Sequence, residues 1–94
     1  MPALLIRHHV ADFDSWKEGF DGDALTRQAN GSQGGWIFRD AADPNVILVL
    51  LEWDDIERAR LFVASDNLVE VITRSGVVGE PAILFLEEVG CPTA

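Results

Sequence analysis

The sequence predicts an α+β fold in the order β-α-β-β-α-β, with one four-stranded antiparallel sheet and helices on a single face. The central observation is the segment 46–53, Val-Ile-Leu-Val-Leu-Leu-Glu-Trp, which lacks the polar alternation of a half-exposed strand and therefore indicates a strand covered on both faces. A second observation is that two segments with apolar residues at helical spacing flank a predicted β-hairpin. With 94 residues, the chain is long enough for a single domain, residues 1–94.

The first predicted strand covers residues 3–10, an aliphatic stretch of strand length. Because side chains alternate along a strand, Leu4, Ile6, His8 and Val10 share one face, which we assign to the helix-packed core. His9 then points to the opposite face, toward a partner subunit or solvent. Adjacent histidines on a strand face opposite sides, so this pair is not suited to chelating one metal ion.

A helix is expected from residue 11 onward, with Asp12 or Asp14 capping its free N–H groups. Phe13, Trp16 and Phe20 are spaced as one stripe that faces the sheet. Gly22 weakens or kinks this helix at a cost of ~1 kcal/mol relative to alanine. The helical pattern resumes over residues 24–28 and stops at the Asn30-Gly31 pair, which suits a C-terminal cap.

The second half of the chain is predicted to begin with a hairpin. A strand over residues 34–40 and a turn over residues 42–45 lead directly into the long apolar strand. Asp54 or Asp55 then caps a helix whose buried side lies within residues 56–63, and a further helical pattern follows over residues 65–76. An irregular stretch, residues 77–81, precedes the last strand at residues 82–89.

The composition excludes several classes of partner. The chain has 16 acidic and 7 basic residues, a net charge of −9, and its basic residues are scattered, so nucleic acid and anionic membranes are poor partners. The single cysteine, Cys91, allows no intramolecular disulfide and no thiolate metal cluster within one chain. Neither a signal peptide nor an apolar run of the ~20 residues that span a bilayer is present, so we expect a cytoplasmic protein.

The apolar strands also predict an assembly. In the strand order 4-1-3-2 that this topology usually adopts, residues 4–10 and 46–53 are central and the helices cover only one of their faces. The other face would expose a large aliphatic patch, which on a soluble protein marks an interface. A two-fold homodimer that pairs the sheet faces buries it, so the expected protein partner is a second copy of the chain.

The topology, the length and the junction Leu51-Glu52-Trp53-Asp54-Asp55 resemble the ferredoxin-like dimeric α+β barrel superfamily. The nearest resemblance is to small proteins grouped with antibiotic-biosynthesis monooxygenases. Residues 9–17, the segment 38–40 and the segment 43–45 also resemble uncharacterised members of that group. The resemblance covers essentially the whole chain. It implies a pocket within each subunit, between the sheet and the helices.

We predict His8 as the catalytic residue, because it is the one titratable group on the helix-packed face with an ordinary pKa near neutrality and so suits a general base. The alternative is a hydrogen-bonded histidine of the core. The residues predicted to bind ligand are Trp53, Trp36, Trp16, Phe13, Phe62 and Arg39. For the aromatic residues the alternative is core packing, and for Arg39 it is a salt bridge across the dimer interface. As a ligand-binding residue, Arg39 would hold a carboxylate or phenolate in a bidentate grip. No spaced set of metal ligands is present, and we expect no metal site.

The resemblance implies a cofactor-independent monooxygenase, cyclase or isomerase that acts on a hydrophobic aromatic small molecule, with no cofactor. Tyrosine is absent from the sequence, although such enzymes often use one to orient the substrate. Phe62 stands where many relatives carry a histidine, which argues against haem degradation. The alternative function is a non-catalytic dimer that binds a small ligand or serves a structural role. A ligand-responsive regulator ranks last, because the chain has no DNA-reading segment.

Overall fold

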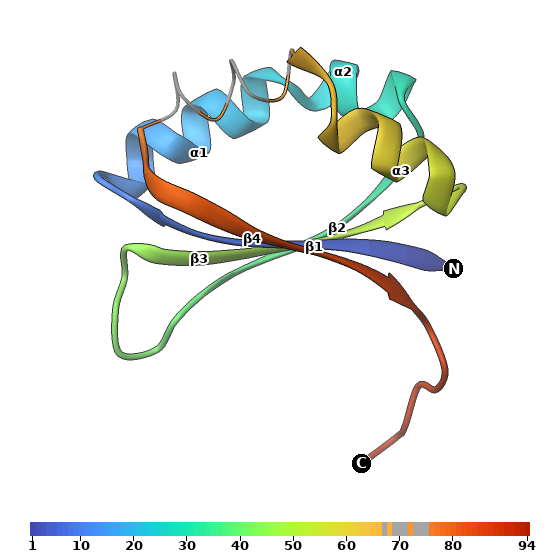
Figure 1. Ribbon diagram of the computed structural model, residues 1–94. Coiled ribbons are helices and arrows are strands. Elements are labelled where there is room, and N and C mark those ends of the chain that lie inside the picture. The colour runs from blue at the N-terminus through green and yellow to red at the C-terminus, as the bar shows by residue number, and fades with distance from the viewer. Residues whose placement is uncertain (67, 69–71, 73–75) are drawn as a thin grey trace.

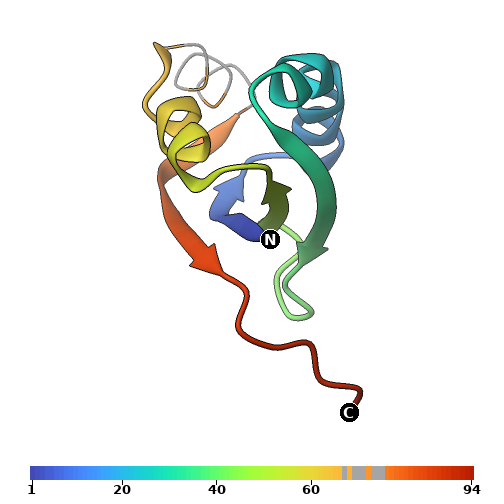
Figure 2. The same cartoon turned by 90° about the vertical axis from the view of Figure 1, so that its right-hand side faces the viewer.

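The strands form one antiparallel sheet, and every described helix lies on the same side of it (Figures 1 and 2). The computed structural model describes residues 1–66, 68, 72 and 76–94. The sheet order is β2-β3-β1-β4, which confirms the predicted strand order and fold class. The elements in chain order are β1 (Pro2–Val10), α1 (Phe13–Gly22), α2 (Ala24–Ala29), β2 (Ser32–Arg39), β3 (Val46–Trp53), α3 (Ile56–Val63) and β4 (Val77–Glu87).

The two central strands carry the core on their helix-facing side. Leu4 pairs with Leu51, and Ile6 pairs with Val49, so these side chains share one face. All four are buried, together with Trp53, which has no exposed surface. In Figure 2 the helix layer is divided: α1 and α2 cover the β2 side of the sheet, and α3 covers the β4 side.

Acidic residues cap both long helices, as predicted. The side chain of Asp12 accepts a hydrogen bond from the Ser15 N–H at 3.0 Å, and Asp55 accepts one from the Glu57 N–H at 2.9 Å. The predicted weak point at Gly22 is where α1 ends, and a second short helix begins at Ala24. Of the two predicted candidates, Asp54 and Asp55, it is Asp55 that caps α3.

The predicted irregular stretch 77–81 was wrong, because β4 already begins at Val77. Its pairing with β1 shifts register between Arg7 and His9, and Gly79 has φ +74°. Pro81 is accommodated because β4 is an edge strand, where a missing N–H leaves no partner unsatisfied. The predicted helical pattern over residues 65–76 lies mostly outside the described residues. Within it, Leu68 is buried and packs in the core.

The other edge strand, β2, begins two residues earlier than predicted, at Ser32, and its register against β3 shifts between Ser32 and Gly34. Gly35 lies against β3 so closely that a Cβ there would overlap the Leu50 carbonyl oxygen. This close approach requires glycine. No helix within the described part of the chain is long and apolar enough to cross a membrane.

Candidate functional site

His8 lies on the helix-facing side of β1, and its side chain is enclosed. The residue is 6% exposed, and neither ring nitrogen has a hydrogen-bond partner among the described residues. Burial lowers the pKa of His8 to about 4, because the charged imidazolium loses its hydration. The imidazole is therefore neutral near pH 7. A buried polar group without a partner costs about 1–3 kcal/mol, so the site favours a ligand that offers His8 a hydrogen bond.

An aromatic row on α1 packs against His8. The row consists of Phe13, Trp16 and Phe20, the predicted stripe. The Trp16 ring centroid lies 5.3 Å from that of His8 and 5.1 Å from that of Phe20. The Phe13 centroid lies 5.8 Å from that of Trp16 on the other side. From Trp16, which packs against the buried imidazole, the row therefore extends toward the surface at both ends, to Phe13 and to Phe20.

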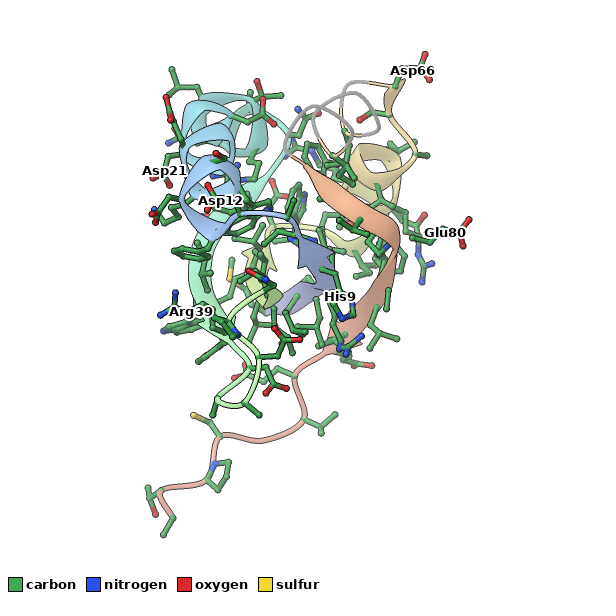
Figure 3. The ribbon with its side chains drawn as sticks, turned by 90° about the vertical axis from the view of Figure 1, so that its left-hand side faces the viewer. His9, Asp12, Asp21, Arg39, Asp66 and Glu80 are labelled. Carbon is green, nitrogen blue, oxygen red and sulfur yellow. The ribbon has the colours of Figure 1, made fainter. Side chains whose placement is uncertain are left out.

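An arginine stacks on each end of the row. The Arg39 guanidinium carbon lies 4.8 Å from the Phe13 ring centroid, and that of Arg27 lies 3.6 Å from the Phe20 ring centroid. At these distances each guanidinium is attracted to the ring face. The two arginines differ in surroundings: Arg39 is exposed, and Figure 3 shows it at the periphery of the molecule, whereas Arg27 is half-buried.

Beside His8 is a small enclosed cavity of about 40 Å³. Its described lining is mostly apolar and comes from the sheet, the aromatic row, Phe62, Leu68 and Ile72, and two charged residues, Asp23 and Arg27, also border it. This volume accommodates about one water molecule and is far below the roughly 300–1,000 Å³ of typical ligand pockets. The cavity alone is therefore too small for an aromatic substrate.

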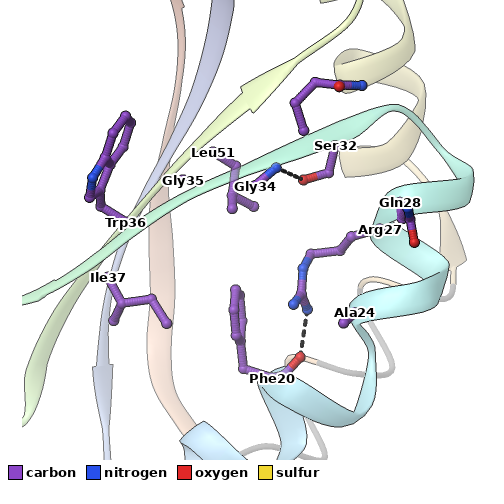
Figure 4. Close-up of a pocket in the computed structure, with 11 residues that line it drawn as sticks. Phe20, Ala24, Arg27, Gln28, Ser32, Gly34, Gly35, Trp36, Ile37 and Leu51 are labelled. Atoms are coloured by element: carbon purple, nitrogen blue, oxygen red, sulfur yellow. Dashed lines mark hydrogen bonds between the residues drawn. The ribbon is translucent and has the colours of Figure 1, made fainter.

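A larger cleft of about 430 Å³ adjoins this cavity. It lies between the edge strand β2 and the helices α1 and α2, and it shares Phe20, Arg27 and Leu51 with the cavity lining (Figure 4). Gly34 and Gly35 form part of its floor, next to the irregular start of β2, and bulged strands of this kind often border sites. Its size falls within the range of ligand pockets. The cleft and the His8 cavity together form the candidate site.

The Trp53-Asp54 junction holds α2, and hence Arg27, in place. The Trp53 indole N–H donates to the Asn30 carbonyl at 2.9 Å, the Asp54 N–H donates to the Gly31 carbonyl at 3.0 Å, and Arg58 donates to the Ala29 carbonyl at 3.0 Å. These bonds satisfy carbonyls that the end of α2 would otherwise leave free. Trp53 and Asp54 belong to the segment 51–55 that carries the family resemblance, and in this chain they have a structural role.

Gly31→Ala is expected to destabilise the protein by about 1–3 kcal/mol. Gly31 has φ +116°, and a Cβ there would stand 2.7 Å from the Trp53 indole nitrogen and closer still to Asp54. Gly22→Ala is the matched control, because nothing lies within 4 Å of that position and its φ is not positive. Urea unfolding of both variants checks the prediction. Equal stabilities would contradict this role for Gly31.

The structure brings together three of the predicted site residues. His8, Trp16 and Phe62 line the small cavity, and Trp53 packs beside Phe62 with ring centroids 5.1 Å apart. Trp53 lines neither the cavity nor the cleft, and Phe13 lies at the outer end of the aromatic row, also outside both. Their predicted ligand-binding role stays a prediction: the indole N–H of Trp53 donates to the Asn30 carbonyl at the end of α2, and Phe13 stacks against Arg39.

Two further predicted site residues, Trp36 and Arg39, lie differently with respect to the cleft. Trp36 borders the cleft, but its side chain is 53% exposed and points away from Phe20 and Arg27 in Figure 4, because it pairs with Leu50 on the open sheet face. Arg39 makes no salt bridge in the described part of the chain and does not line the cleft. The arginine that faces the candidate site is Arg27, which the sequence analysis did not single out.

Among the described residues no group of three or more His, Cys, Asp or Glu side chains is arranged to hold a metal ion. The groups described at the candidate site include the imidazole of His8, the guanidinium of Arg27, the carboxylate of Asp23 and the aromatic rings. That set can bind a planar ring, accept a proton at a neutral imidazole nitrogen and hold an anion.

The fold is that of the antibiotic-biosynthesis-monooxygenase-like structures, which confirms the resemblance at the level of fold. A candidate antibiotic biosynthesis monooxygenase from Bordetella bronchiseptica is similar with a TM-score of 0.76 and 15% identity, over 94% of this chain and 96% of that one. SnoaB, a cofactor-independent oxygenase from Streptomyces nogalater, gives a TM-score of 0.70 and 14% identity, over 94% of each chain. Rv0793 from Mycobacterium tuberculosis gives 0.68 and 10%, over 99% and 100%. No family model and no curated protein sequence matches the chain.

Proposed function

We propose that this protein binds a hydrophobic aromatic small molecule in the cleft and acts on it as a cofactor-independent oxygenase. The observation that carries the proposal is the buried imidazole of His8, whose two nitrogens lack partners among the described residues and which lies next to the aromatic row and the cleft. The structural likeness to SnoaB, a cofactor-independent oxygenase, supports the reaction class.

In this proposal, the neutral imidazole of His8 accepts a proton from a phenolic, electron-rich substrate. Its low pKa makes the imidazole a weak base, but a substrate anion formed beside it would stabilise the imidazolium and raise that pKa. The substrate carbanion reduces O₂, so that a ring CH₂ becomes C=O, one oxygen atom enters the product and the other leaves as water. The substrate supplies all the electrons, and the step calls for no cofactor.

A substrate in the cleft reaches His8 only if the shared wall of Phe20 and Arg27 moves, because the cavity itself measures about 40 Å³. This small volume is the observation that favours the second candidate, a dimer that binds a ligand in the outer cleft without catalysis. The two candidates differ in whether His8 contacts the ligand.

Thermal unfolding against a panel of polycyclic phenols and quinones tests the proposal. A ligand at a hundredfold excess over its Kd stabilises the native state by about 2.7 kcal/mol and raises Tm accordingly. We expect a shift with one aromatic class, and we expect His8→Leu to weaken binding of that class by about tenfold, the loss of one hydrogen bond. His9→Leu, one residue along on the opposite face, is the matched control.

Oxygen uptake with the compound that binds then separates the two candidates. Uptake that His8→Leu abolishes supports the oxygenase. Binding without uptake, and unaffected by His8→Leu, favours the non-catalytic ligand-binding dimer. No shift anywhere in the panel would leave a structural dimer whose aromatic residues serve the core.

We also propose that the chain works as a homodimer through the open face of its sheet. Leu84, Leu5, Leu50 and Trp36 are cross-strand neighbours and form one continuous apolar line across all four strands. Phe38, Leu48 and Ala82 lie in the next line with Arg7. Both lines are on the face opposite the helices, and large apolar patches of this kind mark interfaces. In a two-fold dimer the same patch of each subunit would meet its copy.

A further inference from the structure

Arg27 is a half-buried cation whose guanidinium makes one hydrogen bond among the described residues. One guanidinium nitrogen, Nη1, donates to the Phe20 carbonyl at 2.6 Å. No carboxylate lies within 4 Å of the guanidinium among the described residues, whose ion pairs use Met1, Lys17, Arg58 and Arg60 instead. An arginine has five N–H donors, so the contacts that Arg27 makes with the described residues leave several of them for a ligand.

Arg27 also carries an electrostatic cost. Burial lowers the pKa of Arg27, and the nearby carboxylates of Asp23 and Asp21 offset part of that effect. Arginine nevertheless stays charged in proteins, so the site holds a partly dehydrated cation that is only partly compensated. A bound anion would provide that compensation together with charge-assisted hydrogen bonds.

The surroundings of Arg27 suit an aromatic body attached to that anion. The apolar part of the cleft lining consists of Phe20 and Ala24 of the helices and Ile37 and Leu51 of the sheet. Polar side chains, Gln28, Ser32 and Gln33, line the rest, and Arg27 borders both the cleft and the His8 cavity (Figure 4). Gly34 leaves the floor open, since nothing lies within 4 Å of the position a Cβ would take there. A flat ring therefore has apolar contacts on two sides while its acidic group lies at Arg27.

We propose that the cleft recognises aromatic carboxylic acids, with Arg27 as the anion-binding residue. The inference rests on the proposed function and deepens it, because it gives the class of substrate: an aromatic compound that carries a carboxylate in addition to the group that faces His8. A planar guanidinium suits a carboxylate because it offers two parallel N–H groups. The net charge of −9 makes non-specific anion binding to this surface unfavourable, so affinity for a carboxylate must come from a specific site.

Calorimetric titration with 2-naphthoate and with its neutral isostere 2-naphthamide tests the proposal. We expect the wild-type protein to bind the carboxylate at least about tenfold more tightly than the amide, the usual worth of a charge-assisted hydrogen bond. Arg27→Gln is expected to abolish this preference and to leave amide binding unchanged. Arg27→Lys keeps the charge without the planar donors and should retain an intermediate preference.

Arg60→Gln is the matched control, because Arg60 also stacks on a phenylalanine, Phe85, with 4.6 Å between its guanidinium carbon and the ring centroid, but lies outside the cleft. Circular dichroism of each variant verifies folding. Equal binding of the two naphthalenes to the wild type, or an unchanged preference in Arg27→Gln, would overturn the proposal.

The outcomes also separate this inference from the proposed function. Binding of the amide with no gain for the carboxylate leaves an aromatic site without anion recognition, so only the inference fails. Binding of neither compound contradicts both. A preference that depends on Arg27 but is unaffected by His8→Leu supports anion recognition in the cleft and removes His8 from ligand binding.

Discussion

Leu50→Glu is expected to convert a dimer into a monomer. Leu50 lies on β3, in the middle of the apolar line that also contains Leu5 and Trp36, on the sheet face that the helices leave open. In a two-fold dimer each substitution places two carboxylates in the interface. Each buried leucine contributes about 1.5–3 kcal/mol, and burying an unpaired charge costs more than that contribution. The loss is therefore large enough to separate the subunits at micromolar concentrations.

Light scattering after size exclusion measures this directly. The wild type should give twice the mass of the 10.3 kDa chain, and Leu50→Glu should give the mass of a single chain. Leu25→Glu is the matched control, since Leu25 is 79% exposed on α2, on the helix side, and should remain a dimer. Circular dichroism verifies that the monomeric variant keeps its secondary structure. A wild-type monomer would contradict the dimer, and loss of assembly in both variants would contradict the open sheet face as its interface.

Most of the fold could be predicted because its signals are local. The unbroken apolar run of β3 marked a central strand, the stripe of Phe13, Trp16 and Phe20 marked α1, and Asp12 and Asp55 marked helix starts. Each of these three signals depends on residues that are close together in the sequence. The start of β4 was missed because its pairing depends on a register shift against β1 and on Pro81 lying at a sheet edge. Neither condition can be read from the segment itself.

The site was only partly predictable, for a similar reason. His8 was assigned to the helix-facing side because β1 alternates regularly there. For β2 the alternation was ambiguous, since Trp36 and Phe38 on one face and Ile37 on the other are all apolar. A strand with two apolar faces does not fix its own orientation. Here the two aromatic residues face outward, toward the proposed interface, and Ile37 packs against the core.

Arg27 was missed because the chain breaks between α1 and α2. Helical periodicity relates residues within one helix, and the break at Gly22 and Asp23 changes the axis before α2 begins. The bonds from Trp53 and Asp54 to the end of α2 then set its orientation. These contacts join residues more than twenty positions apart, so a sequence pattern on α2 alone could not show that Arg27 faces the site.

Acidification should destabilise this protein because the buried His8 resists protonation. His8→Leu should remove that part of the pH-dependent loss of stability. The pKa of His8 is about 4 in the folded state, against 6.5 for an ordinary histidine, because burial disfavours the imidazolium. The unfolded chain therefore takes up a proton first as the pH falls, and stability declines from about pH 6.5 toward about pH 4. The full difference corresponds to about 3 kcal/mol, of which about 2 kcal/mol is lost by about pH 5.

Urea unfolding at neutral pH and at about pH 5, at one fixed protein concentration, measures this loss. The carboxylates contribute in the wild type and in the variant alike, so the informative quantity is the difference between their pH dependences. Over this interval the free energy of unfolding of His8→Leu should fall by about 2 kcal/mol less than that of the wild type. At neutral pH the two proteins should have similar stabilities, because the substitution replaces a buried polar ring, which has no partner among the described residues, by an apolar side chain. His9→Leu removes the exposed neighbouring histidine and serves as the control. Parallel pH dependences in the wild type and His8→Leu would show that His8 is hydrated or paired in solution, and the site would then lose the unpartnered imidazole on which the oxygenase proposal depends.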